Sequence, residues 1–127
     1  MRIIKLLLID DEEEFCATLA ERLSLRSFDV TFTRSGSSGL ELLQKATTQE
    51  FPDVLILDML MPDMDGLATL RAVRRAYPTL PVIMLTGHAS TEDGLRAMQQ
   101  GASDYLLKPV DIGTLIEKIM RVLPDSI

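Results

Sequence analysis

The sequence predicts an α/β fold, a doubly wound parallel sheet of five strands in the order 2-1-3-4-5. Short apolar runs recur five times, and segments with helical spacing of apolar residues separate them. Three of the runs are apolar throughout, as strands are when helices cover both faces of a sheet. Because crossovers between parallel strands are right-handed, few strand orders remain, and we choose 2-1-3-4-5.

The five apolar runs are the predicted strands. The first, third and fourth are apolar throughout, whereas the second alternates and the fifth is short, as expected at the edges of a sheet. In chain order they are "LLLI" (6–9), "VTF" (30–32), "VLIL" (54–57), "VIML" (82–85) and "YLL" (105–107).

Between the strands, apolar residues stand three or four positions apart, which is the spacing of one helix face. The second helix is predicted over roughly 37–46, where glycines and serines obscure its start. The apolar faces of the other helices are Phe15, Leu19 and Leu23, then Leu67, Leu70 and Val73, then Leu95 and Met98, and finally Leu115, Ile119 and Val122.

Residues at the predicted helix ends agree with this division. Ser90 and Asp111 are placed to cap the fourth and fifth helices, and Asp65 is expected to cap the third. Gly101 stands where the fourth helix would end in the left-handed conformation, and Pro124 follows the last helix.

One domain is expected over residues 1–127, because this length is typical of a single hydrophobic core. The sequence leaves open whether these residues are a whole protein or part of a longer one.

No run approaches the about 20 apolar residues of a membrane helix, so no membrane role is expected. The single cysteine, Cys16, allows no internal disulfide, which suits the cytoplasm, and it is expected on the inner face of a helix.

The net charge of −6 argues against a nucleic-acid surface, which needs clustered basic residues to meet phosphates. The one dense basic cluster is "RAVRRAY", with Arg71, Arg74 and Arg75. We expect these arginines to cover the solvated outer face of a helix.

Polar residues of selected types follow four of the predicted strands. Asp10 and Asp11 follow the first strand, Asp58 the third, Thr86 the fourth and Lys108 the fifth. Because the carboxyl ends of parallel strands share one edge of the sheet, these side chains are expected to gather there, where ligands bind in such sheets.

Three carboxylates at one place need a positive partner. Two unit charges about 4 Å apart repel by roughly 4 kcal/mol at an effective dielectric of about 20. One lysine does not offset three acids, and an all-oxygen cluster favours a hard divalent cation such as Mg²⁺ over zinc. Mg²⁺ keeps positions open for phosphate oxygens, so the cluster indicates phosphoryl chemistry, with Asp58 as the nucleophile.

Four stretches together resemble the receiver domain of two-component response regulators: "LLLIDDEE", "DVLILDMLMPDMDGL", "VIMLTGHA" and "GASDYLLKP". They occur in the order and spacing of that family and cover essentially the whole chain. The resemblance implies a flavodoxin-like, CheY-like (βα)5 fold. It also implies the strand order given above, so the choice of that order and the resemblance are not independent of each other.

The resemblance also implies roles at the acidic edge. Asp58 matches the residue that accepts a phosphoryl group from the phosphohistidine of a sensor histidine kinase or phosphotransfer protein. Asp11 matches the direct ligand of Mg²⁺, Asp10 a ligand acting largely through water, and the backbone carbonyl of Leu60 a third protein ligand. Mn²⁺ is a plausible substitute for Mg²⁺.

Further positions match the phosphoryl contacts and the switch of the family. Lys108 matches the lysine that pairs with the phosphoryl oxygens, and the bond to Pro109 is usually cis in the family. Thr86 matches the switch hydroxyl, Gly87 the residue whose amide helps to hold the phosphoryl group, and Tyr105 the aromatic that turns inward when the hydroxyl moves.

The resemblance implies a phosphoacceptor signalling domain and not a conventional turnover enzyme. It implies an output face on the fourth helix, fifth strand and fifth helix, and a monomer or phosphorylation-dependent dimer. Two alternatives compete with this interpretation. A haloacid-dehalogenase-type phosphatase would need a second acid where Leu60 stands and a larger chain. A receiver-like interaction module that works without phosphate usually lacks one of the acids or the lysine.

Several other polar residues have simpler interpretations. Asp63 is expected in a turn, and the glutamates at 12–14 are expected to favour a helix N-terminus, with a water-mediated metal role as the alternative for Glu12. The lone His88 is expected to be solvated. In the family, the positions of Leu60 and His88 are variable and influence the lifetime of the phosphoryl group.

Overall fold

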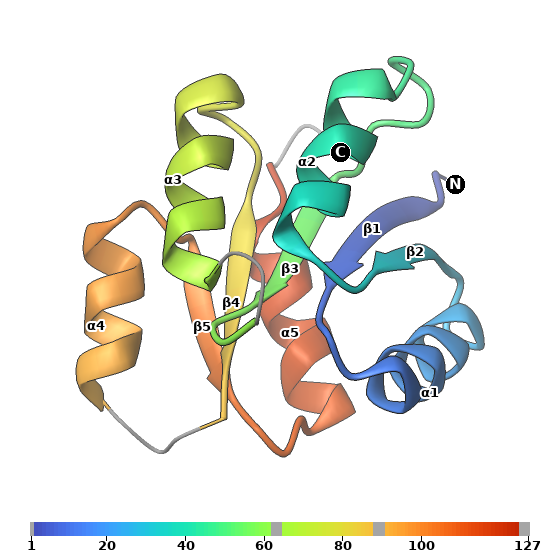
Figure 1. The fold of residues 1–127 in the computed structure, drawn as a ribbon. Helices are drawn as coiled ribbons and strands as arrows, with labels where there is room; N and C mark the ends of the chain where they lie inside the picture. Colours follow the sequence, from blue (N-terminus) through green and yellow to red (C-terminus); the bar gives the residue numbers. More distant parts are fainter. Residues whose placement is uncertain (1, 62–64, 88–90, 125–127) are drawn as a thin grey trace.

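The computed structural model describes residues 2–61, 65–87 and 91–124 (Figure 1). Its strands are β1 (Ile4–Ile9), β2 (Phe28–Thr33), β3 (Val54–Asp58), β4 (Val82–Thr86) and β5 (Asp104–Leu107). Its helices are α1 (Glu13–Ser24), α2 (Gly36–Lys45), α3 (Gly66–Ala76), α4 (Thr91–Gln99) and α5 (Ile112–Val122). Strands and helices alternate along the chain as the apolar pattern predicts.

The five strands form one parallel sheet in the order β2-β1-β3-β4-β5, which confirms the predicted topology. β1 and β3 are neighbours, with Ile9 opposite Leu57. The chain winds toward β2 on one side of this pair and toward β5 on the other. The carboxyl ends of β1 and β3 therefore meet at the switch point, where open α/β sheets bind ligands.

Alternate residues of the strands pack on opposite faces of the sheet. In β1, Leu6 and Leu8 belong to the core that α1 and α5 cover, whereas Leu7 and Ile9 belong to the core under α2, α3 and α4 (Figure 1). β3 and β4 are buried along their whole length, as expected for central strands between two helix layers.

The predicted apolar face of α4 is wrong. Leu95 and Met98 are 55% and 41% exposed, and the helix meets the sheet through Gly94 and Ala97, which are buried. The Tyr105 ring of β5 lies so close that a Cβ on Gly94 would stand 2.5 Å from two ring atoms. Because the ring leaves room only for small residues, α4 is held by little apolar area.

The predicted role of Arg74 is also wrong, because this arginine is half-buried and not a purely solvated residue. Its Nε and Nη2 donate to the carbonyl of Gly101 at 3.0 and 2.7 Å. Its Nη1 donates to the carbonyls of Tyr77, Pro78 and Leu80 at 3.3, 3.1 and 2.8 Å. One guanidinium thus joins the end of α3 to the connection between α4 and β5.

The helix ends follow the predicted chemistry where the structure describes them. Asp65 accepts from the amide of Ala68 at 2.7 Å, and Asp111 accepts from the amide of Thr114 at 2.9 Å. Gly101 has a φ of +107°, and the amide of the next residue donates back to the carbonyl of Ala97, so α4 ends in a Schellman-type turn. The predicted cap Ser90 lies outside the described residues.

Cys16 is fully buried on the inner face of α1, as predicted, and its Sγ donates to the carbonyl of Asp10 at 3.3 Å. Burial, followed by the negative charge of Asp10, raises the pKa of this thiol to about 12.

Across the described segments of the chain, no helix is long and apolar enough to cross a membrane.

Candidate functional site

Three carboxylates lie together at the carboxyl end of the sheet. Asp58 is the last residue of β3, and Asp10 and Asp11 directly follow β1, its neighbour. One carboxylate oxygen from each residue lies within 4.8 Å of the other two. Asp10 is fully buried and Asp58 is 5% exposed, so water screens their mutual repulsion poorly.

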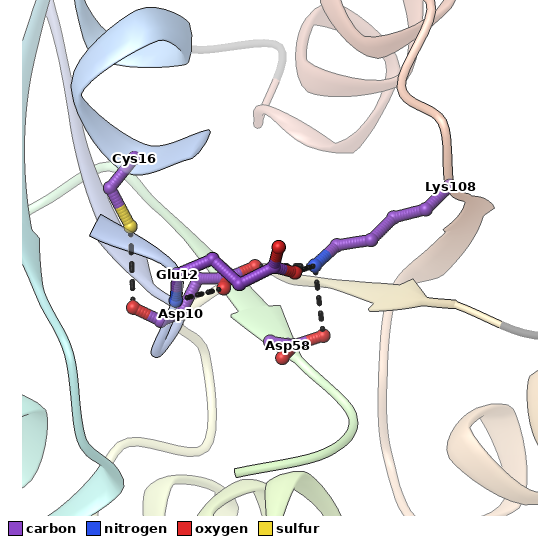
Figure 2. Close-up of polar contacts among 5 residues, drawn as sticks. All are labelled: Asp10, Glu12, Cys16, Asp58 and Lys108. Atoms are coloured by element: carbon purple, nitrogen blue, oxygen red, sulfur yellow. Dashed lines mark hydrogen bonds and ion pairs between the residues drawn. The ribbon is translucent and has the colours of Figure 1, made fainter. Parts of the chain in front are cut away.

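Lys108 brings a positive charge into this cluster from the end of β5 (Figure 2). Its Nζ lies 2.8 Å from Asp10 Oδ2, 3.2 Å from Glu12 Oε1 and 3.5 Å from Asp58 Oδ1. Its amide donates to the carbonyl of Thr86 at 2.8 Å, which extends the pairing of β4 and β5 to the site. The ammonium therefore joins residues of β1, β3 and β5 at one point.

Burial and charge shift the pKa values of this pair upward. The pKa of Asp58 is raised to about 6, first because burial disfavours the carboxylate and then because Asp10 is negative, while Lys108 partly offsets both effects. Burial acts to lower the pKa of Lys108, but its hydrogen bond to Asp10 and the charge of Asp58 outweigh this and raise it. The lysine thus stays charged, whereas Asp58 can take a proton in mildly acidic solution.

Backbone contacts fix the carboxylates in place. The amide of Glu12 donates to Asp10 Oδ1 at 2.9 Å, so Asp10 accepts on both of its oxygens (Figure 2).

Beyond Asp58, the chain returns so that the amide of Gly66 donates to the carbonyl of Met59 at 2.9 Å. A Cβ on Gly66 would stand 2.2 Å from the carbonyl oxygen of Asp58, so only glycine fits at this close approach.

The remaining predicted site residues lie on or just after β3, β4 and β5. Thr86 is 1% exposed at the end of β4, the strand next to β3. Gly87 follows it, with nothing within 4 Å of an added Cβ. Leu60 is 57% exposed, two residues beyond Asp58. Tyr105 is half-buried in β5 against Gly94.

Other predicted features stand as follows. The peptide bond between Lys108 and Pro109 is cis, as the resemblance implies. His88 and Asp63 lie outside the described residues. Met59 and Met61, on either side of Leu60, are buried in the core.

Sequence reasoning missed two neighbours of Lys108. Glu12 was assigned to the dipole of α1, yet its carboxylate contacts the ammonium. The ring of Phe15 lies under the same ammonium, with its centroid 4.5 Å from Nζ. Phe15 is the third residue of α1, and its closeness in sequence to the acids that follow β1 is the only signal that could have pointed to the site.

The donor set fits a hard divalent cation. Asp10, Asp11 and Asp58 together offer carboxylate oxygens, which Mg²⁺ prefers. The excess of acids over the single lysine leaves negative charge for a cation to neutralise. The residues present are therefore suited to Mg²⁺.

The chain matches the family described as response regulator receiver domain over residues 6–120. It belongs to this family. The fold agrees, since a receiver domain from Clostridium thermocellum superposes with a TM-score of 0.87 at 32% identity, covering 94% of each chain.

Receiver domains of longer proteins are similar to this chain as well. The transcriptional regulatory protein CpxR of Escherichia coli (strain K12) is 38% identical over 122 residues, which are 96% of this chain and 50% of CpxR. The DNA-binding transcriptional regulator NtrC of Klebsiella pneumoniae is 37% identical over 116 residues, 91% of this chain and 24% of NtrC. The chain thus spans half or less of these relatives.

The apparent affinity for Mg²⁺ is expected to become weaker as the pH is lowered, because protons compete with the ion for Asp58, whose pKa is about 6. Its carboxylate is mostly charged above that pKa and mostly protonated below it, so the affinity should be about tenfold weaker at pH 5 than at pH 7. Titration of Mg²⁺ followed by amide chemical shifts measures this.

The variant Asp58→Asn is the control for this titration. Its affinity for Mg²⁺ should be weaker at both pH values and should change much less between them, because the titrating group is gone. An equal pH dependence in both proteins would contradict the assignment to Asp58.

Proposed function

We propose that this receiver domain, residues 1–127, accepts a phosphoryl group on Asp58 and signals by the conformational change that follows. One observation carries the proposal: Asp58 ends the central strand next to two further carboxylates, with the ammonium of Lys108 3.5 Å from its Oδ1. This arrangement presents a nucleophile, a cation site and a fixed positive charge at one point.

In the proposed step, a carboxylate oxygen of Asp58 attacks the phosphorus of a phosphohistidine in a sensor histidine kinase or phosphotransfer protein. A P–O bond forms, giving an acyl phosphate, and the P–N bond breaks with its electron pair left on the imidazole nitrogen, which then takes a proton from solvent. No general base is needed, because the nucleophile is already a carboxylate.

Lys108 stabilises the product in this proposal. The phosphoryl group carries more negative charge than the carboxylate it replaces, and the ammonium already lies beside Asp58. Asp10, Asp11, Asp58 and the backbone carbonyl of Leu60 would hold Mg²⁺ or Mn²⁺. When bound, the ion supplies charge neutralisation for the transferred group.

Thr86 and Tyr105 are proposed to pass the change to the surface, with Gly87 contacting the phosphoryl group. The proposed output face comprises α4, β5 and α5, which would meet an effector domain or a downstream partner. Since each Asp58 holds one phosphoryl group, we propose a signalling switch and not a turnover enzyme. A cytoplasmic location and a monomer or phosphorylation-dependent dimer stay predictions.

Intact mass spectrometry after incubation with Mg²⁺ and acetyl phosphate tests the proposal. We expect an increment of one phosphoryl group that is absent in Asp58→Ala and present in Asp29→Ala, a control in which an exposed aspartate of β2 is removed. The chain has no tryptophan, so mass is preferred to intrinsic fluorescence. If neither acetyl phosphate nor a phosphorylated kinase gives an increment, the alternative of a phosphate-independent interaction module holds instead.

A slow loss of the phosphoryl group is expected from Leu60, whose apolar side chain stands 57% exposed two residues after Asp58 and cannot orient water. Leu60→Asn should shorten the phosphoryl half-life about tenfold, less than the about 100-fold of a positioned general base, because an amide can orient the attacking water but does not take its proton. The decay of the phosphorylated mass over time measures it.

Leu25→Asn is the matched control, since it changes another exposed leucine, at the end of α1, in the same way. It should leave the half-life unchanged. An unchanged half-life in Leu60→Asn itself would remove Leu60 from the explanation.

A further inference from the structure

The ammonium of Lys108 has one neighbour that is not an acid. It lies over the ring of Phe15, with Nζ 4.5 Å from the ring centroid. This distance is within the range of a cation–π interaction, which extends to about 6 Å from the centroid. Phe15 belongs to α1, is half-buried and packs against the core between α1, α5 and the sheet. The ring is therefore held by the core, while its face meets the site.

We propose that Phe15 is a positioning residue for Lys108. Its ring keeps the ammonium at the site while the ammonium exchanges a carboxylate for a phosphoryl oxygen. This inference rests on the proposed phosphorylation of Asp58 and adds to it a residue that none of the matched motifs contains.

The exchange of partners explains why a ring is suited to this position. Asp10 and Glu12 hold the ammonium through oxygen atoms at 2.8 and 3.2 Å, and such contacts are lost when the ammonium moves toward a phosphoryl group. A ring attracts a cation through its quadrupole over the whole face, so a small shift of the ammonium costs little of this attraction. Phe15 can thus remain a neighbour of Lys108 before and after phosphorylation.

The flexibility of lysine makes such a neighbour useful. The side chain has four methylene groups and three rotatable donors, so it loses rotamer freedom when its ammonium is fixed. Lys108 is 15% exposed as a side chain, and the ring covers part of what would otherwise be solvated. An ammonium already restricted to the site needs less rearrangement to meet the transferred group.

The contact itself can be measured in the unphosphorylated protein, whether or not the domain accepts phosphate. The sequence has four lysines, Lys5, Lys45, Lys108 and Lys118, so their side-chain NMR signals can be assigned individually. A ring face shifts the ε-methylene protons of Lys108 upfield relative to the other three. We expect this shift to disappear in Phe15→Leu and to persist in Phe15→Tyr. Its absence in the unchanged protein would overturn the proposal.

The kinetic test uses Mg²⁺ and acetyl phosphate with the same variants. Phe15→Leu keeps an apolar side chain but loses the ring, and it should lower the maximal rate of Asp58 phosphorylation about threefold to tenfold, in line with a cation–π contact. The Mg²⁺ concentration at half-maximal rate should stay the same, because Phe15 supplies no metal ligand. Phe15→Tyr should restore the rate to within about twofold, since it keeps the ring face.

Phe51→Leu is the matched control, because Phe51 packs against Tyr77 with ring centroids 5.2 Å apart and takes no part in the site. It should leave the rate unchanged. Equal rates in Phe15→Leu and the unchanged protein would overturn the proposal, and so would equal losses in Phe15→Leu and Phe15→Tyr, which would mark a packing role. If the unchanged protein takes up no phosphoryl group, the proposed function fails, while the NMR shift still decides on the contact.

Discussion

Lys108→Met is expected to lower the free energy of unfolding by about 3 kcal/mol in the absence of divalent cations, because it leaves a buried charge unpaired. Asp10 is fully buried, and one of its two oxygens depends on the Lys108 ammonium at 2.8 Å. The loss of the ammonium also leaves the three neighbouring carboxylates without the positive charge that offsets their repulsion. Urea unfolding at neutral pH measures the change.

Mg²⁺ should restore much of the lost stability in Lys108→Met, since it binds the folded cluster and neutralises the same charges. Phosphorylation by acetyl phosphate should nevertheless be at least about tenfold slower, because the charge that stabilises the transferred group is missing. Lys45→Met is the control, as Lys45 pairs with Glu41 on the exposed surface of α2, and such pairs contribute little. If Lys108→Met and Lys45→Met had the same free energy of unfolding in the absence of divalent cations, this account would be contradicted.

Arg74→Ala should destabilise the domain by about 2 to 3 kcal/mol, because it leaves several backbone carbonyls without the guanidinium that they share. The largest local effect is expected at Gly101, which accepts from two nitrogens of Arg74. Amide hydrogen exchange should therefore become faster over residues 100–103, together with a fall in the urea midpoint.

Arg75→Ala removes the same charge from the next position of α3, where the side chain is exposed. It should change stability by less than about 0.5 kcal/mol, as surface substitutions usually do. If both variants lose stability equally, the effect comes from charge or helix propensity and the link to Gly101 has no special weight. Equal exchange rates over 100–103 in Arg74→Ala and the unchanged protein would lead to the same conclusion.

The sequence sufficed for the strands and for the gathering of polar residues at one edge, whereas the strand order also depended on the resemblance to receiver domains. Apolar runs mark central strands reliably because burial on both faces excludes polar residues, and every carboxyl end of a parallel sheet lies at the same edge. Topology therefore places Asp10, Asp11, Asp58 and Lys108 at one edge, and the long side chain of Lys108 reaches past β4 to the acids.

The errors come from contacts that depend on side-chain packing between distant segments. Arg74 meets Gly101, 27 positions away, and Lys108 meets Glu12, 96 positions away, and no local pattern records either contact. The inner face of α4 was misplaced because large apolar residues were expected to be buried. The Tyr105 ring instead fills the space, and Gly94 and Ala97 take the contact.

The contact between Lys108 and Asp10 joins positions 98 residues apart, near opposite ends of the chain. On the ribosome the acids of β1 and β3 emerge first, and the ammonium that balances them comes only when β5 has been made. Pairing of β1 with β3 before that point would bring these acids together without the ammonium that offsets their charge. Completion of the acidic site thus waits for the last strand of the sheet, and of the described elements only α5 is made after it.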